Sequence, residues 1–192
     1  MKVLPIYVYD HAILKKKAQK VEHVDESTKS FIEDMIHTMH NAEGIGLAAN
    51  QVGSPMAITV IDISPVEGYE STKPFVMINP EITFYSEEES DYEEGCLSLP
   101  HVRELVIRPE AIQVSYYDQN INPQTIQADG LLARVMQHEI DHLNGIYFTD
   151  RLSQLKRTLL QSKLRRISKG ETSADYTIVL PDGSIISGDD IE

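Results

Sequence analysis

Apolar residues recur at helical spacing in three stretches of the chain. The first lies between Asp25, a residue typical of helix N-caps, and Gly44, where the pattern stops. The second runs from Leu131 to Leu143, and the third covers residues 151–169. Each stretch keeps its apolar residues on one side of an α-helix, so the sequence predicts three amphipathic helices.

Most of the chain between the first two helices follows a strand pattern instead. β-Branched and aromatic residues gather in short runs separated by turn residues, and these runs predict a mixed sheet. After the third helix, Pro181-Asp182-Gly183 separates two further runs and predicts a hairpin in the tail. The predicted strands are Met56–Ile63, Phe75–Ile78, Ile82–Tyr85, Leu105–Ile107, Ala111–Tyr117, Thr125–Ala128, Tyr176–Leu180 and Ser184–Ile186.

Length and composition limit the classes of protein that fit this pattern. With 192 residues, 41% of them hydrophobic and 24% charged, the chain is expected to form one globular domain with a short tail. The net charge of −13 argues against general binding to nucleic acid or membrane surfaces. We find neither a signal-peptide core nor a bilayer-spanning apolar run, so we expect a cytoplasmic protein with no DNA or membrane partner.

Charge is distributed unevenly along the chain. Residues 151–169 hold seven of the 17 basic residues and no acidic one. This concentration indicates a dedicated anionic partner, although the solvated polar face of a packing helix would have the same composition. Residues 81–94 hold seven acidic residues, and most of this segment is expected to form a solvated strand or loop.

The second predicted helix carries two histidines four residues apart, His138 and His142. This spacing places both imidazoles on one face of an α-helix, where they can reach the same ion. Glu139 follows the first histidine and lies close to that ion without occupying a ligand position. The pattern is that of a metal site with its own base. A helix can also carry two histidines by chance, so a third ligand is needed to decide.

Two further segments could complete such a site. The glycine-rich loop Gly44–Gln51 permits close approach of a ligand, but it lacks the Lys-Ser/Thr ending of a phosphate-binding loop, which disfavours nucleotide binding. Its one long polar side chain, Gln51, either reaches across a cleft or faces water. The only cysteine, Cys96, lies in the segment Glu94–Pro100 and cannot form an intramolecular disulfide. It is therefore a small core residue, a nucleophile or a ligand.

Together, the segments Gly44–Gln51, Glu94–Pro100 and Gln137–His142 resemble those of bacterial peptide deformylases, and the likeness extends over residues 1–168. The resemblance implies an α+β fold in which antiparallel β-sheets pack around a central metal-binding helix, with a C-terminal helix. The activity it implies is removal of the N-formyl group from the N-terminal formylmethionine of newly synthesised polypeptides, with release of formate.

The resemblance also assigns a role to each residue of the candidate site. Glu139 would be the general acid/base, and Gln51 and the backbone N–H of Leu97 would stabilise the oxyanion. Three protein ligands leave a position for water, whose pKa the ion lowers so that hydroxide attacks the formyl carbon. The ion would be natively Fe(II), with Zn(II), Ni(II) or Co(II) also able to occupy the site. Its ligands would be Cys96, His138 and His142.

The implied substrate pocket is apolar and suits a methionine side chain. Leu131 and Val135 could equally be ordinary core residues. Arg134 would lie at the edge of the pocket, and together with Asn50 it departs from residues common in the family, which leaves preferences beyond methionine open. The residues implied to bind substrate are Gly44, Ile45, Gly46, Tyr92, Arg103, Leu131 and Val135.

Domain organisation and partners also follow from the resemblance. Residues 1–170 would form the catalytic domain, including the basic helix 151–169, and residues 171–192 would form a tail with the predicted β-hairpin. The substrates would be N-formylmethionyl nascent peptides. In this family the C-terminal helix can dock the enzyme on the ribosome, which gives residues 151–169 a hypothetical partner in ribosomal RNA.

Two other functions compete with this interpretation. A zinc metalloprotease shares the H-E-x-x-H pattern but usually takes its third ligand from His, Glu or Asp, so Cys96 disfavours it. A non-catalytic metal-binding module would leave Glu139 and Gln51 without a role. Formate release from a formylmethionyl peptide distinguishes the three functions.

Overall fold

The computed structural model describes residues 1–188, and within them three α-helices occupy the predicted stretches. The carboxylate of Asp25 caps the first helix by accepting a hydrogen bond from the backbone N–H of Thr28 at 2.8 Å. The third helix begins later than predicted, because Arg151 belongs to a separate 3-10 helix, η3 (Phe148–Arg151), and Ser153 is the N-cap. The helices are α1 (Glu26–Asn41), α2 (Gly130–Leu143) and α3 (Gln154–Ser168).

Five strands form one sheet in the order β2-β3-β4-β7-β8, and every neighbouring pair is antiparallel. Strand β4 joins two segments that were predicted as separate strands, Phe75–Ile78 and Ile82–Tyr85. The chain between them stays paired with β7 through register shifts rather than leaving the sheet in a turn. The strands are β2 (Gly46–Ala48), β3 (Ile58–Ile61), β4 (Phe75–Tyr85), β7 (Ala111–Tyr117) and β8 (Pro123–Asp129).

A two-stranded antiparallel ribbon is formed by β5 (Glu89–Cys96) and β6 (Leu99–Pro109). Its first strand is built largely from the acidic segment that was expected to be solvated. Asp91 and Glu93 are exposed, whereas Glu94 points to the opposite face and is buried. One acidic side chain of this segment is therefore directed into the protein, next to Cys96.

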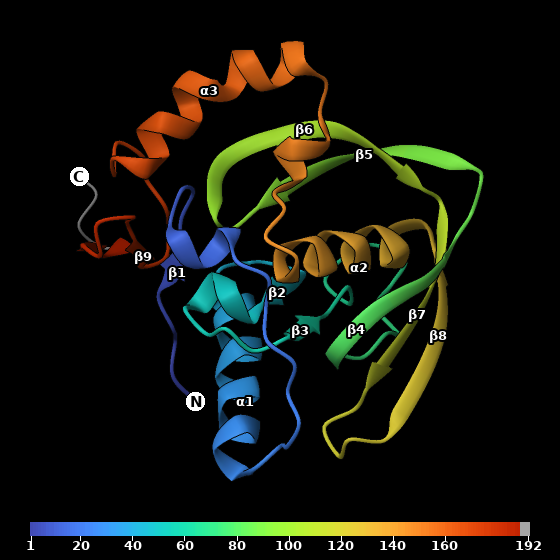
Figure 1. The fold of residues 1–192 in the computed structure, drawn as a ribbon. Coiled ribbons are helices and arrows are strands. Elements are labelled where there is room, and N and C mark those ends of the chain that lie inside the picture. The colour runs from blue at the N-terminus through green and yellow to red at the C-terminus, as the bar shows by residue number, and fades with distance from the viewer. Residues whose placement is uncertain (189–192) are drawn as a thin grey trace.

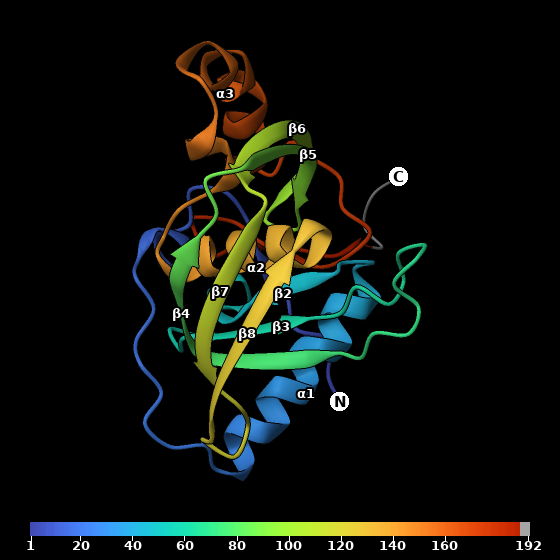
Figure 2. The same cartoon turned by 90° about the vertical axis from the view of Figure 1, so that its right-hand side faces the viewer.

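Helix α2 is enclosed by the five-stranded sheet and the β5–β6 ribbon (Figures 1 and 2). Its Ala133 and Met136 pack with Ile61 and Met77 of the sheet in one buried cluster. Eleven of its 14 residues are buried, polar ones included, and buried polar side chains need partners within the protein. The arrangement confirms the predicted α+β fold, with antiparallel sheets around a central helix and a further helix near the C-terminus.

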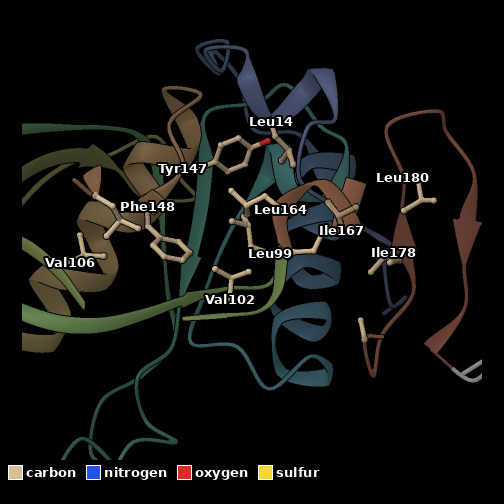
Figure 3. Close-up of a cluster of buried hydrophobic side chains, with 13 residues drawn as sticks. Leu14, Leu99, Val102, Val106, Tyr147, Phe148, Leu164, Ile167, Ile178 and Leu180 are labelled. Atoms are coloured by element: carbon tan, nitrogen blue, oxygen red, sulfur yellow. The ribbon is translucent and has the colours of Figure 1, made fainter. Parts of the chain in front are cut away.

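The chain after α2 returns to cover the ribbon and the N-terminal strand. Figure 3 shows Ile167 of α3 in one buried cluster with Leu99 of β6 and Ile178 of the tail. The tail strand β9 pairs in parallel with β1 and antiparallel with β10. Residues 189–192 of the predicted tail lie outside the described residues. These strands are β1 (Ile6–Tyr7), β9 (Ile178–Val179) and β10 (Ile185–Ile186).

The buried apolar side chains of α3, Leu164 and Ile167, lie in its second half, whereas its first half contacts the ribbon through Lys156, which pairs with Glu104 of β6 at 2.9 Å. Leu155 and Leu159 are 71% and 73% exposed, although their helical spacing with the other leucines suggested one apolar side. The first half of the helix, which lies above the ribbon in Figure 1, therefore leaves these two leucine side chains largely uncovered. None of the helices in residues 1–188 combines the length and the apolar character that crossing a membrane requires.

Candidate metal centre and cleft

Cys96, His138 and His142 come together although Cys96 is far from the histidines in the sequence. Their potential ligand atoms all lie within 4.8 Å of one another. The Nε2 of His142 is 3.1 Å from the Cys96 sulfur and 3.2 Å from the Nε2 of His138. One thiolate and two imidazoles at such separations can converge on a tetrahedral divalent ion and leave one position open. The donor set therefore fits a catalytic metal.

Glu94 fixes the orientation of the first histidine. Its Oε2 lies 2.9 Å from Nδ1 of His138, so an Nδ1–H donated to the carboxylate leaves Nε2 free to bind an ion. The carboxylate also accepts two hydrogen bonds from Arg108, at 2.7 and 2.8 Å, and one from Arg134 at 3.0 Å. Burial alone would raise the pKa of Glu94, but the bonds from Arg108 and His138 hold it well below its usual range.

Arg108 links two buried carboxylates. Its side chain is 1% exposed, and its third hydrogen bond, of 2.6 Å, goes to Asp141 on α2. Arg151 of η3 donates two further hydrogen bonds to the same Asp141. The ribbon, α2 and η3 are thereby joined around the histidines by charge-assisted bonds among Arg108, Arg151, Glu94 and Asp141.

Glu139 lies beside the three candidate ligands and is 4% exposed. Burial is the main cause that raises its pKa, to about 7, with the nearby carboxylates of Glu94 and Asp141 acting in the same direction. Its Oε1 lies over Gly46, where a Cβ would be only 2.4 Å from that oxygen. Gly46 therefore leaves space for the Glu139 carboxylate, which explains why the second glycine of the loop is needed.

Gln51 faces the cleft rather than water. Its Oε1 accepts a hydrogen bond of 2.8 Å from the backbone N–H of Ala48. Its Nε2 lies 3.2 Å from the hydroxyl of Ser98 and 3.6 Å from the Cys96 sulfur. The neighbouring Asn50, which departs from the family pattern, is buried and donates through Nδ2 to the carbonyl of His142. Both side chains of the loop thus support the site.

A cleft of about 450 Å³ opens beside these residues, within the range of small-ligand sites. Val135 both lines the cleft and packs in a buried core cluster, so it is a cleft residue and a core residue at the same time. Arg134 lines the cleft as expected, but its side chain is buried, and its guanidinium bonds to Glu94 and to the backbone carbonyl of Ser90. All residues predicted to bind substrate line the cleft: Gly44, Ile45, Gly46, Tyr92, Arg103, Leu131 and Val135.

Sequence reasoning missed several residues of the site. Glu94 was treated as part of a solvated acidic run, although its place two residues before Cys96 was a usable signal. Arg108 stands in no recognisable motif, so nothing local indicated its role. Ala174, Asp175 and Tyr176 of the tail also line the cleft, and no pattern in the tail pointed to this.

Comparison with known proteins gives a consistent result. Peptide deformylase of Salinibacter ruber is 46% identical over an alignment of 191 residues, which covers 96% of this chain and 98% of the relative. The crystal structure of a peptide deformylase from Legionella pneumophila matches with a TM-score of 0.79 at 40% identity, and covers 88% of this chain and 97% of that chain. A peptide deformylase from Synechococcus elongatus, solved in complex with actinonin, matches with a TM-score of 0.75 at 41% identity, over 83% of this chain and 85% of that chain.

The sequence model of the polypeptide deformylase family matches residues 3–158, which include all three segments that build the site. The curated relatives share a large part of the sequence, and the solved structures share the fold. The chain belongs to the polypeptide deformylase family of metal-dependent hydrolases.

Proposed function

We propose that this protein removes the N-formyl group from the N-terminal formylmethionine of newly synthesised polypeptides and releases formate. One observation carries the proposal. The sulfur of Cys96 and the imidazoles of His138 and His142 gather beside a cleft whose lining includes a buried carboxylate, Glu139, and a fixed amide, Gln51. Membership of the deformylase family supports the same substrate.

The metal in this proposal is held by Cys96, His138 and His142. A divalent ion in that position would polarise the formyl group and supply hydroxide near neutral pH. We propose Fe(II) as the native ion, with Zn(II), Ni(II) or Co(II) also accepted, because a site of one thiolate and two imidazoles binds each of them. Glu94, which orients His138, would keep the site ready for binding.

Glu139 is proposed to move the proton. Its carboxylate would take a proton from the attacking water and return it to the leaving amine. A pKa of about 7 suits both the uptake and the release of this proton, because the protonated and ionised forms of Glu139 are then present in similar amounts at neutral pH. Such a group typically contributes about 10²–10⁴ in rate.

Gln51 and the backbone N–H of Leu97 are proposed to stabilise the oxyanion. Stabilisation of this kind requires donors that are fixed before the reaction begins. The bond from the Ala48 N–H to Oε1 holds the Gln51 amide and directs Nε2 toward the turn that carries Cys96 and Ser98. Loss of one such donor typically costs about 10²–10³ in rate.

The formylmethionine side chain is proposed to occupy the apolar end of the cleft, against Ile45, Leu131 and Val135. Arg103 pairs with Glu93 at 3.7 Å, and its side chain is 70% exposed. The exposed guanidinium of Arg103 could therefore contact backbone carbonyl oxygens of the substrate residues that follow the formylmethionine. Arg134 also lines the cleft, and because its guanidinium bonds to Glu94 and lies 5.1 Å from the ring centre of Tyr92, we propose that it supports the cleft wall.

Formate release from a formylmethionyl tripeptide tests the function. The purified, metal-loaded protein is expected to release formate, and Glu139→Ala is expected to retain metal while losing turnover. A metalloprotease would instead cleave an internal peptide bond, and a metal-binding module would do neither. Equal activity of Glu139→Ala and the wild type would rule out the proposed proton transfer.

We also propose that α3 docks on ribosomal RNA, and that the protein works in the cytoplasm, where ribosomes supply its substrate. The residues that would make this contact are fewer than the sequence suggested, because Arg151 is engaged with Asp141. Arg157 and Arg165 are exposed on α3 and Lys169 is exposed directly after it, and of these Arg157 also lies 3.5 Å from Asp150. Phosphate contacts of this kind weaken steeply as salt rises.

Charge removal tests ribosome docking better than deletion of α3, which would expose buried Leu164 and Ile167. The triple variant with alanine at 157, 165 and 169 is expected to lose co-sedimentation with ribosomes at low salt. Alanine at the exposed residues 16, 17 and 20 removes the same charge elsewhere and serves as the control. Equal co-sedimentation of both variants would refute docking through α3.

A further inference from the structure

The tail after α3 is built into the core of the protein. Gly170, with φ of +74°, ends α3 and lets the chain turn back. The backbone N–H of Ile6 donates to Thr177 at 2.9 Å, and that of Val8 donates to Val179 at 3.1 Å. Ile178 is 1% exposed. Residues 171–186 therefore occupy a fixed place, although they follow the region that the family sequence model matches.

This fixed tail brings Tyr176 into the cleft. The residue lines the cleft wall, and its hydroxyl donates a hydrogen bond of 2.7 Å to the carbonyl of Leu97. Leu97 directly follows the candidate ligand Cys96. A side chain from the end of the chain thus contacts the segment that carries both a metal ligand and a proposed oxyanion donor.

The turn from Cys96 to Ser98 is held by side chains and backbone from separate parts of the chain. The backbone N–H of Tyr9, just after β1, donates to the carbonyl of Ser98 at 2.9 Å. Gln51 contacts the Ser98 hydroxyl at 3.2 Å. Tyr176 adds the bond to Leu97. Because β1 pairs with β9, the tail, the N-terminal strand and the turn form one hydrogen-bonded unit.

We propose that Tyr176 is a positioning residue for the active site, and that its hydroxyl fixes the turn from which the Cys96 thiolate and the Leu97 N–H are presented. The proposal rests on the proposed deformylase function. The Leu97 carbonyl and the Leu97 N–H belong to two rigid peptide planes that meet at one Cα. Holding the carbonyl restricts rotation about that Cα and so limits the directions open to the N–H.

The contact is suited to this role over the whole working pH range. Burial raises the pKa of Tyr176 above that of a free phenol, so the hydroxyl remains a donor at any pH at which the protein works. The ring is partly buried and packs against two core clusters, which fixes the hydroxyl in turn. A phenylalanine would preserve this packing and remove only the hydrogen bond.

Tyr176→Phe in the full-length protein tests the proposal. Loss of one neutral hydrogen bond corresponds to about a three- to tenfold change, and we expect kcat for a formylmethionyl tripeptide to fall by that factor. KM should stay unchanged, because the ring that lines the cleft remains. The matched control is Tyr116→Phe, which removes a hydroxyl from a half-buried tyrosine of β7 outside the cleft.

A second measurement does not depend on turnover. With Co(II) bound, the charge-transfer absorption from the Cys96 thiolate reports on the geometry of the turn. We expect this band to shift in Tyr176→Phe and to remain as in the wild type in Tyr116→Phe. Lower thermal stability with unchanged kcat and an unchanged band would overturn the proposal, because the bond would then be purely structural. If the wild type released no formate, the proposed function would fail, while the cobalt band would still decide whether Tyr176 positions the turn.

Discussion

Replacing Gly46 by alanine is expected to displace Glu139 while leaving the metal ligands in place. A Cβ at this position would lie 2.4 Å from Oε1 and 2.9 Å from Cδ of Glu139. Ordinary contacts begin near 3.4 Å, so the carboxylate must retreat by about 1 Å. Gly46 is not among the residues with positive φ, and the effect therefore arises from space alone.

The size of the effect follows from how tightly Glu139 is enclosed. At 4% exposure the carboxylate cannot swing into solvent, and the new methyl group would also press on Val135 at 2.9 Å. A misplacement of about 1 Å in a catalytic group costs about 10²-fold in rate. Overpacking costs about 1–3 kcal/mol, which for a chain of this size lowers Tm by about 3–10 °C. We expect kcat to fall by about 10²-fold with the metal retained.

Formate release and metal content measured on the same preparation check this prediction. Gly95→Ala is the matched control, because a Cβ there meets its nearest neighbour, Cγ of Arg103, at an ordinary 3.5 Å. Its kcat should be close to that of the wild type. Wild-type kcat in Gly46→Ala would refute the steric argument, and so would an equal loss in both variants.

Three further predictions concern the metal, the buried charges and the first helix. Exhaustive chelation should abolish formate release and lower Tm, because metal binds the folded state, and added Co(II) should restore both; activity that survives chelation would contradict a catalytic metal. Arg108→Met removes the cation shared by two buried carboxylates and should lower the free energy of unfolding in urea by about 3–5 kcal/mol. Arg151→Met, at a side chain that is 41% exposed, should cost about 1 kcal/mol or less, and equal losses would count against the argument from burial. Asp25→Ala should lower Tm at neutral pH. Hydrogen bonds from the backbone and side chain of Thr28 and from Ser27 lower the pKa of Asp25 from 3.8 to about 2. The difference in Tm between the wild type and Asp25→Ala should therefore shrink as the pH falls below 3.8 and disappear below about pH 2. A difference in Tm that did not change with pH would show that the carboxylate is not the cap.

Features set by neighbouring residues could be predicted from the sequence. The helix that begins after Asp25 and the pairing of His138 with His142 depend on spacing within a few residues. Cys96 was harder, because local context left it as core residue, nucleophile or ligand. Only the resemblance of three segments to one family favoured the role of ligand, which we propose for it.

Features set by contacts between distant residues could not be predicted. Arg108 and Asp141 are 33 residues apart, and no local sequence pattern connects an arginine of the β5–β6 ribbon with an aspartate of α2. Tyr176 lies 79 residues from Leu97, in a tail that looked like a simple hairpin. Leu155 and Leu159 were misleading for the opposite reason, because helical spacing indicates an apolar side but not whether anything covers it.

The parallel pairing of β1 with β9 has a consequence for synthesis of the protein. Ile6 pairs with Ile178, so β1 finds its partner strand only after the residues between them have been synthesised. At about 5–20 residues per second, that delay is roughly 10–35 s. During it Ile6 and Val8, both fully buried in the folded protein, lack the hydrogen-bond partners that the tail supplies. The hydrogen-bonded unit of β1, β9 and the turn from Cys96 to Ser98 can therefore form only after Ile178 has been synthesised.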